Sequence, residues 1–358
     1  TTSTKWTLSI EGGGWCYDED ACYSRSKTNL GSSTKWSPSS GCGCMNVKDN
    51  AQAGDLSPLD TTCNCIYMPY GDGASFSGYR AKPWPIPGNA SEHLTFRGIK
   101  NFDATVAWAL AHGMDKATDV VLTGGSAGGL STFLHMDRLR AVMAKVAPAA
   151  VVRGAPVVGF FLDHGNFAPQ TGLVPNTKEW ESSANYTAKM KWIYQMQNLT
   201  FGADGGLMPA CQKANPANPH YCFMSPHMQR FIETPFFFFN SRFDAWQLSQ
   251  ELQTNWETAA EQAAVVQYGA DFLTQFKPLR SEAKNGAFIT TCICHGCAWN
   301  ELKDNWAGGK GLTSYQHYAA WMVHNVTGAD ALTVDTRPPN GGGAITPAGG
   351  GAGCKKFP

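Results

Sequence analysis

The chain has 358 residues, of which 43% are hydrophobic, 12% aromatic and 16% charged, and its 28 basic and 28 acidic side chains balance to a formal net charge of zero. This much apolar surface offsets the entropy cost of ordering, which excludes an intrinsically disordered chain. The neutral balance, without a long Lys/Arg run, argues against a nucleic-acid surface, and no apolar stretch is long enough to predict a membrane span. We therefore expect a soluble globular protein.

The first half of the chain predicts two strands, a long irregular region and a strand between two helices. Residues 6–10 resemble a strand that runs into the turn Gly12-Gly13-Gly14, and residues 16–90 are mostly irregular, with a short strand at 65–68. Apolar residues recur three or four apart over 94–112, which is typical of an amphipathic helix. The continuously apolar segment 119–123 then predicts a buried parallel strand, followed by a helix over 127–146.

The second half continues the alternation. Further strands are predicted at 151–161, 236–240 and 286–291, and further helices at 184–199, 248–268, 271–276 and 315–324. Alternating strands and helices favour an α/β fold with a mostly parallel sheet. We expect a single domain over residues 1–335, whose N-terminus is clipped or mature because it lacks an initiator Met and a signal segment, and a glycine-rich flexible tail over 336–358.

Twelve cysteines and four Asn-x-Ser/Thr triplets suggest a secretory route with disulfides. The triplets begin at Asn89, Asn185, Asn198 and Asn325. The alternative is zinc, because soft ligands lie close together around Cys294, His295 and Cys297. Structural zinc sites usually have two or four residues between paired cysteines, and most pairs here do not, so disulfides are favoured.

The sharpest local motif is Gly124-Gly125-Ser126-Ala127-Gly128, a G-x-S-x-G sequence between a predicted strand and a predicted helix. That context exposes a nucleophilic serine at the end of the strand and aims the Ala127 N–H at a developing oxyanion. The alternative is a plain glycine-rich turn such as a phosphate-binding one, but no G-x-G-x-x-G motif or Walker lysine accompanies it.

A nucleophilic serine needs a histidine base and a carboxylate, in the chain order Ser, acid, His for an α/β-hydrolase. Of the nine histidines, His295 alone lies in a loop just after a late predicted strand. Asp244 is the best-placed acid because it follows the strand at 236–240, although an N-cap role for the next helix is a real alternative. Asp163 is the second candidate acid.

Five motifs in order resemble the pectin acetylesterase and Notum carboxylesterase family. They are Glu11-Gly12-Gly13-Gly14-Trp15-Cys16, Asp72-Gly73-Ala74-Ser75-Phe76, the stretch around Ser126, Asn240-Ser241-Arg242-Phe243-Asp244-Ala245-Trp246-Gln247, and Cys294-His295. The resemblance implies an α/β-hydrolase-like fold, a triad of Ser126, Asp244 and His295, and an oxyanion hole formed by the backbone N–H groups of Gly14, Trp15 and Ala127.

The resemblance also implies the function, for which neither a metal nor an organic cofactor is needed. The leading hypothesis is a secreted, monomeric serine esterase of the extracellular space or cell wall that removes acetyl groups from an acylated pectic polysaccharide. A second hypothesis is a Notum-like deacylase that removes a fatty acyl group from a protein. A hypothesis of another class is an inactive glycan-binding protein that grips sugars with Trp15, Trp84 and Trp246.

Overall fold

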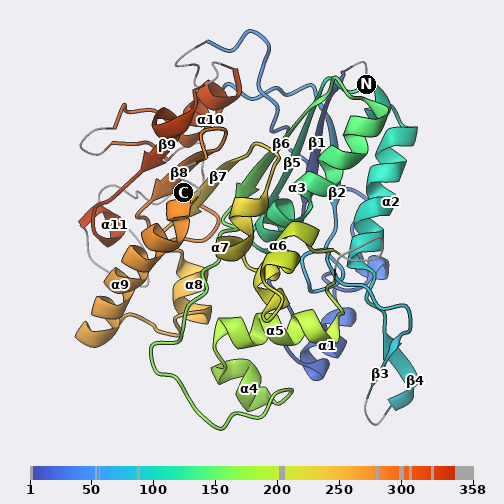
Figure 1. Ribbon diagram of the computed structural model, residues 1–358, viewed down its shortest axis with the longest axis vertical. Coiled ribbons are helices and arrows are strands. Elements are labelled where there is room, and N and C mark those ends of the chain that lie inside the picture. Colours follow the sequence, from blue (N-terminus) through green and yellow to red (C-terminus); the bar gives the residue numbers. More distant parts are fainter. Residues whose placement is uncertain are drawn as a thin grey trace.

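A parallel sheet of seven strands runs through the computed structural model (Figure 1), which describes residues 3–52, 55, 57–86, 89–200, 206–278, 282–297, 302–305, 309–323 and 326–342. Its strands lie in the order β2-β1-β5-β6-β7-β8-β9, and every neighbouring pair is parallel. The bounds are β1 Lys5–Ile10, β2 Asn64–Met68, β5 Asp119–Gly125, β6 Val151–Val157, β7 Phe237–Ser241, β8 Gly286–Thr290 and β9 Leu332–Val334. The predicted α/β-hydrolase-like class, a mostly parallel sheet flanked by helices, is thus confirmed.

Both faces of this sheet are covered, as expected for parallel strands. The alternation of side chains along a strand separates the four consecutive phenylalanines before Asn240. Phe236 and Phe238 pack into the larger core with α2 (Gly98–Ala111) and α3 (Ala127–Val146), whereas Phe237 and Phe239 pack into a second core with Tyr318 and Trp321 of α10 (Ser314–Val323). The four-phenylalanine run is therefore what a strand buried on two sides requires.

The helices follow the predicted positions with some differences. Their bounds are α1 Glu19–Ser26, α2 Gly98–Ala111, α3 Ala127–Val146, α4 Lys178–Ser183, α5 Tyr186–Met196, α6 Pro209–Ala214, α7 Ser225–Met228, α8 Ala245–Gln250, α9 Ala259–Phe276, α10 Ser314–Val323 and α11 Pro339–Gly342. The helix α1 and the hairpin of β3 (Trp84–Ile86) and β4 (Asn89–Leu94) lie in the region predicted to be irregular.

The predicted helices at 248–268 and 271–276 are divided differently in the structure. The short helix α8 ends at Gln250, and α9 starts afresh after a capping box of Thr258 and Glu261. It then continues unbroken through Gly269, where a side chain would lie 2.1 Å from the ring of Phe243. Gly269 thus serves close packing and does not end the helix.

Part of the segment predicted to be a flexible tail is packed. Asn340 is buried, its N–H donates to the Thr291 carbonyl (2.7 Å) and its Oδ1 accepts from the Ile293 N–H (2.9 Å). The segment 336–342 therefore covers the exit of β8, because it satisfies polar backbone groups there. Residues 343–358 lie outside the described residues.

Disulfides bridge the cysteines, as the sequence predicts. The described bridges are Cys16–Cys22, Cys42–Cys65, Cys44–Cys63, Cys211–Cys222 and Cys294–Cys297, and Cys292 is also disulfide-bonded. Two of the four predicted glycosylation acceptors, Asn185 and Asn198, are exposed. Asn325 and the side chain of Asn89 lie outside the described residues.

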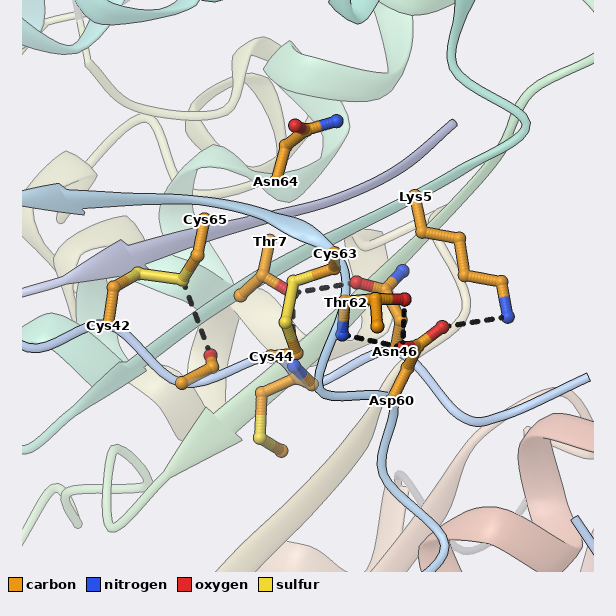
Figure 2. Close-up of a disulfide and its surroundings, with 12 residues drawn as sticks. Lys5, Thr7, Cys42, Cys44, Asn46, Asp60, Thr62, Cys63, Asn64 and Cys65 are labelled. Atoms are coloured by element: carbon orange, nitrogen blue, oxygen red, sulfur yellow. Dashed lines mark hydrogen bonds and ion pairs between the residues drawn. A yellow bond between two sulfur atoms is a disulfide. The ribbon is translucent and has the colours of Figure 1, made fainter. Parts of the chain in front are cut away.

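Two of these disulfides fasten the long loop between β1 and β2 to the edge of the sheet. Figure 2 shows Cys42–Cys65 and Cys44–Cys63 side by side next to Thr7 of β1. The Thr7 hydroxyl donates to Asn46 Oδ1 (2.8 Å) and accepts from the Met45 N–H (3.0 Å). A loop with little secondary structure of its own is thus held by covalent bonds and buried polar contacts.

Among the helices that the structure describes, none has both the length and the apolar character needed to cross a membrane.

Candidate active site

The strand order reverses beside β1, and the candidate site lies there. From β1 the chain moves outward to β2, returns to β5 on the other side of β1 and then continues towards β9. The loops that leave β1 and β5 therefore diverge at the carboxyl edge of the sheet, which is where open α/β sheets bind ligands. These two loops are the triple-glycine turn and the turn that carries Ser126.

Ser126 occupies a strained turn between β5 and α3. Its φ of 59° and ψ of −125° lie outside the regions that L-residues favour, and its N–H donates to the Val157 carbonyl (3.0 Å). The turn is too crowded for side chains at Gly124 and Gly128, because a Cβ at Gly124 would lie 2.5 Å from the Gly128 carbonyl oxygen and one at Gly128 would lie 2.3 Å from the Ile10 carbonyl oxygen. This is the geometry that a nucleophile at a sharp strand-to-helix turn requires.

The triple-glycine turn lies directly against Ser126. A Cβ at Gly12 would lie 2.3 Å from the Gly125 carbonyl oxygen and 3.0 Å from Ser126 Cβ. Gly14 has a φ of 65°, a left-handed conformation that glycine adopts without strain. The triple-glycine turn thus packs against the turn that carries Ser126, which is where an oxyanion-binding loop is needed.

His295 and Asp244 are paired. The Nδ1 atom of His295 lies 3.0 Å and 2.8 Å from the two carboxylate oxygens of Asp244, which is fully buried. Because a carboxylate only accepts, Nδ1 carries the hydrogen and Nε2 is left as the free base. Burial lowers the pKa of His295, but the hydrogen bond and charge of Asp244 outweigh burial and raise it above its usual value.

Asp244 also caps α8, so its two predicted roles coexist. Its Oδ1 accepts the N–H of Gln247 (3.0 Å), which is the N-cap contact that the sequence offered as the alternative. The cap fixes the carboxylate on the helix end, and that orientation presents it to His295. A single aspartate therefore begins a helix and orients a histidine.

The second candidate acid, Asp163, lies elsewhere. Its carboxylate accepts from Thr187 and pairs with His227 Nε2 at 2.7 Å. The structure thus brings Asp244, rather than Asp163, to His295, and separates two aspartates that both follow a predicted strand.

A cluster of aromatic rings lies beside the histidine. Trp15 is 4.9 Å from Phe161 and 5.5 Å from Trp246 between ring centroids, and Trp246 is 6.3 Å from His295. Tyr186 joins the cluster at 5.8 Å from Trp15. Trp84 instead lies on the β3–β4 hairpin, where its indole donates to Glu19, so the three tryptophans of the glycan-binding hypothesis do not form one platform.

Two residues of the site were missed at the sequence level. Arg25 donates to the Gly13 carbonyl (2.9 Å) and so holds the triple-glycine turn from α1. Ser75 lies between Trp15 and Ala127, inside the motif Asp72-Gly73-Ala74-Ser75-Phe76, for which the sequence predicts no role. No local pattern marks either residue, because their partners are distant in sequence.

Known proteins resemble the chain over most of its length. The sequence profile of the pectinacetylesterase family matches residues 1–333. Pectin acetylesterase 11 of Arabidopsis thaliana is 29% identical over 325 residues, covering 86% of this chain and 74% of its own length. Palmitoleoyl-protein carboxylesterase NOTUM of Drosophila melanogaster is 24% identical, covering 94% of this chain and 47% of its own length. The crystal structure of the Wnt deacylase Notum from Drosophila shares the fold, with a TM-score of 0.74, 21% identity and coverage of 94% of this chain and 89% of that one.

Proposed function

The chain belongs to the pectinacetylesterase family and is a carboxylic ester hydrolase, and on this basis we propose that it is a secreted serine esterase that removes acetyl groups from pectic polysaccharide. The observation that carries the proposed mechanism is the pairing of His295 Nδ1 with Asp244 at the same sheet edge as the strained turn of Ser126. The disulfides and the exposed Asn185 and Asn198 triplets support the secretory part, because disulfides persist in oxidising compartments.

The proposed reaction is acyl transfer in two steps. The Ser126 hydroxyl attacks the ester carbonyl while Nε2 of His295 takes its proton, and the backbone N–H groups of Gly14, Trp15 and Ala127 stabilise the oxyanion. The bond from the carbonyl carbon to the sugar oxygen then breaks, and His295 returns the proton to that oxygen. Water, deprotonated by His295, attacks the acyl-enzyme and releases acetate and free Ser126.

The nucleophile is tested by Ser126→Ala. Acetate release from acetylated pectin should fall by more than about a thousandfold, because the loss of such a nucleophile typically costs at least that much. Thermal unfolding should stay near that of the wild type. The matched control is Ser131→Ala on α3, because the Ser131 hydroxyl is buried and hydrogen-bonds to none of the residues that the structure describes. Retention of substantial activity by Ser126→Ala would exclude this nucleophile.

The aromatic cluster supports a second candidate, removal of a fatty acyl group from a protein. Trp246 is half-buried and lies 6.3 Å from His295 between ring centroids, and the buried rings of Trp15, Phe161 and Tyr186 pack against it, so the wall beside the histidine is apolar, as a long acyl chain requires. A series of p-nitrophenyl esters from acetyl to palmitoyl separates the two readings. A kcat/KM that falls as the chain lengthens supports an acetylesterase, whereas a rise supports the deacylase. If wild-type protein binds pectin but hydrolyses none of these esters, the inactive glycan-binding hypothesis is correct.

A further inference from the structure

The side chain of Ser75 connects two of the three residues of the proposed oxyanion hole, Trp15 and Ala127. The Trp15 indole N–H donates to Ser75 Oγ (2.9 Å), and Ser75 Oγ donates to the Ala127 carbonyl (2.8 Å). Ser75 is fully buried and lies 60 residues from Trp15 and 52 from Ala127. One hydroxyl thus joins the loop after β1 to the first residue of α3.

The backbone of Ser75 is held as firmly as its side chain. Its N–H donates to the Tyr70 hydroxyl (2.8 Å), and its carbonyl accepts from His135 Nε2 (3.1 Å), which lies two turns along α3 from Ala127. The residue has a φ of 51°, a left-handed conformation that is uncommon for serine. Every polar atom of Ser75 therefore has a partner, which is an unusual degree of restraint for one serine.

The conformation of Ser75 is supported by a buried carboxylate. Asp72 Oδ1 accepts the N–H groups of Ala74 and Phe76, each at 3.1 Å, so it brackets Ser75 on both sides. The carbonyl of Ser75 can only accept, so the hydrogen of the His135 ring is on Nε2. The Nδ1 atom of His135 is buried and contacts no hydrogen-bond donor among the described residues, so it carries no hydrogen. Residues 72–76 thus form a restrained turn that presents the Ser75 hydroxyl to Trp15 and Ala127.

We propose that Ser75 is a positioning residue that sets the Trp15 and Ala127 backbone N–H groups at the correct separation for one oxyanion. This inference rests on the proposed function. Oxyanion donors must be held to within about half an ångström, and rigid neighbours are what hold them. Trp15 is on a loop rich in glycine and Ala127 is on a helix, so without a link their relative position would depend on a flexible turn.

The test compares the Ser75→Ala variant with the wild-type protein, using p-nitrophenyl acetate as the substrate. We expect kcat to fall by about ten- to a hundredfold, less than the loss of a whole donor, with KM within about twofold. A boronic acid that forms a tetrahedral adduct with Ser126 should bind more weakly by a similar factor. The midpoint of the acid limb of the pH profile of kcat is set by His295 and should not move. A general structural defect that disturbed the pairing of His295 with Asp244 would shift this midpoint.

Trp15→Phe provides an independent variant. It removes the indole N–H and replaces the indole by a smaller aromatic ring, but it keeps the Ser75 contact with Ala127, so it should lower kcat and boronate affinity in the same way. The double variant should be little worse than either single one, because both break the same link. Ser225→Ala is the matched control, since Ser225 is an equally buried serine whose hydroxyl donates to a backbone carbonyl, that of Gly159 (2.8 Å), rather than joining Trp15 to Ala127.

The outcomes separate this proposal from the proposed function. If Ser126→Ala remains active, the esterase mechanism itself fails. If Ser126→Ala is inactive but Ser75→Ala and Trp15→Phe keep wild-type kcat and boronate affinity, the positioning role is overturned and the mechanism stands. Should Ser75→Ala fail to fold, Trp15→Phe alone decides, because it leaves the turn at 72–76 intact.

Discussion

Asp244 carries two tasks at the scale of a single residue, and the structure explains why they are compatible. Its carboxylate has enough acceptor sites to take the Gln247 N–H and the His295 Nδ1 hydrogen at once. Replacing it with asparagine keeps an acceptor for the helix cap but offers an N–H₂ group to the histidine. That change favours the wrong imidazole tautomer, so the effect on catalysis should exceed the effect on stability.

We therefore predict that Asp244→Asn lowers kcat by at least about two orders of magnitude, because Nε2 would no longer be reliably free to accept the serine proton. Asp163→Asn is the matched control, since Asp163 follows another strand and pairs with His227 instead. It should leave kcat within a few-fold of wild type and act mainly on thermal stability. Steady-state kinetics on p-nitrophenyl acetate check this. A larger loss of kcat from Asp163→Asn than from Asp244→Asn would mean that Asp244 is not the acid that orients His295.

At the scale of elements, the two adjacent disulfides of the β1–β2 loop are nested. Cys44–Cys63 spans 19 residues and lies inside Cys42–Cys65, which spans 23. Either bridge alone closes almost the same loop, so the second adds little further restriction of the unfolded chain. Their stabilisation should therefore be strongly non-additive.

The prediction is that replacing either cysteine pair with serine costs less than about 1 kcal/mol in free energy of unfolding, whereas replacing both costs about 3 kcal/mol, the chain-entropy value for a loop of this length. Urea unfolding of the three variants measures this. Equal costs that simply add would mean that each bridge stabilises by local packing around Thr7 and Asn46, rather than by loop closure.

At the scale of the whole molecule, the large core extends from the sheet to buried polar groups such as His135. Burial lowers the pKa of His135 from 6.5 to about 4, so the folded protein keeps this histidine neutral where the unfolded chain protonates it. The unfolded state then binds more protons between these values, and stability falls as the pH drops through this window. Burial lowers the pKa values of His220 and His317 as well, and both add to the same slope.

We predict that the free energy of unfolding decreases by up to about 3 kcal/mol from His135 alone between pH 6.5 and pH 4, at about 1.4 kcal/mol per unit of pKa shift. Urea unfolding at several pH values measures the slope. His135→Gln keeps a donor for the Ser75 carbonyl but does not titrate, so its stability should depend less on pH by that amount. An unchanged slope in the variant would show that other groups cause the acid sensitivity.

The sequence by itself determined the positions of β1, β2, β5, β6, β7 and β8, the disulfide chemistry and the individual candidates for the site, but not α1, the β3–β4 hairpin or β9. Local patterns carry this information: four phenylalanines predict a strand buried on both faces, and glycines around Ser126 predict a tight turn. The predicted division into helices at 248–268 and 271–276 was wrong, because Gly269 does not end α9. This glycine packs against Phe243, which lies outside the helix, and such a contact cannot be read from the local sequence.

The sequence ranked Asp244 ahead of Asp163 because Asp244 lies later in the chain, but only the tertiary structure shows that Asp244 pairs with His295 whereas Asp163 pairs with His227. Only the tertiary structure gave Ser75 and Arg25 a place beside the site. Hydrogen bonds between residues 12 to 60 positions apart leave no periodic trace in the sequence. The contacts of Ser75 form because β2, β1 and β5 are adjacent parallel strands, so the segments that follow them, which carry Ser75, Trp15 and Ala127, meet at the carboxyl edge of the sheet.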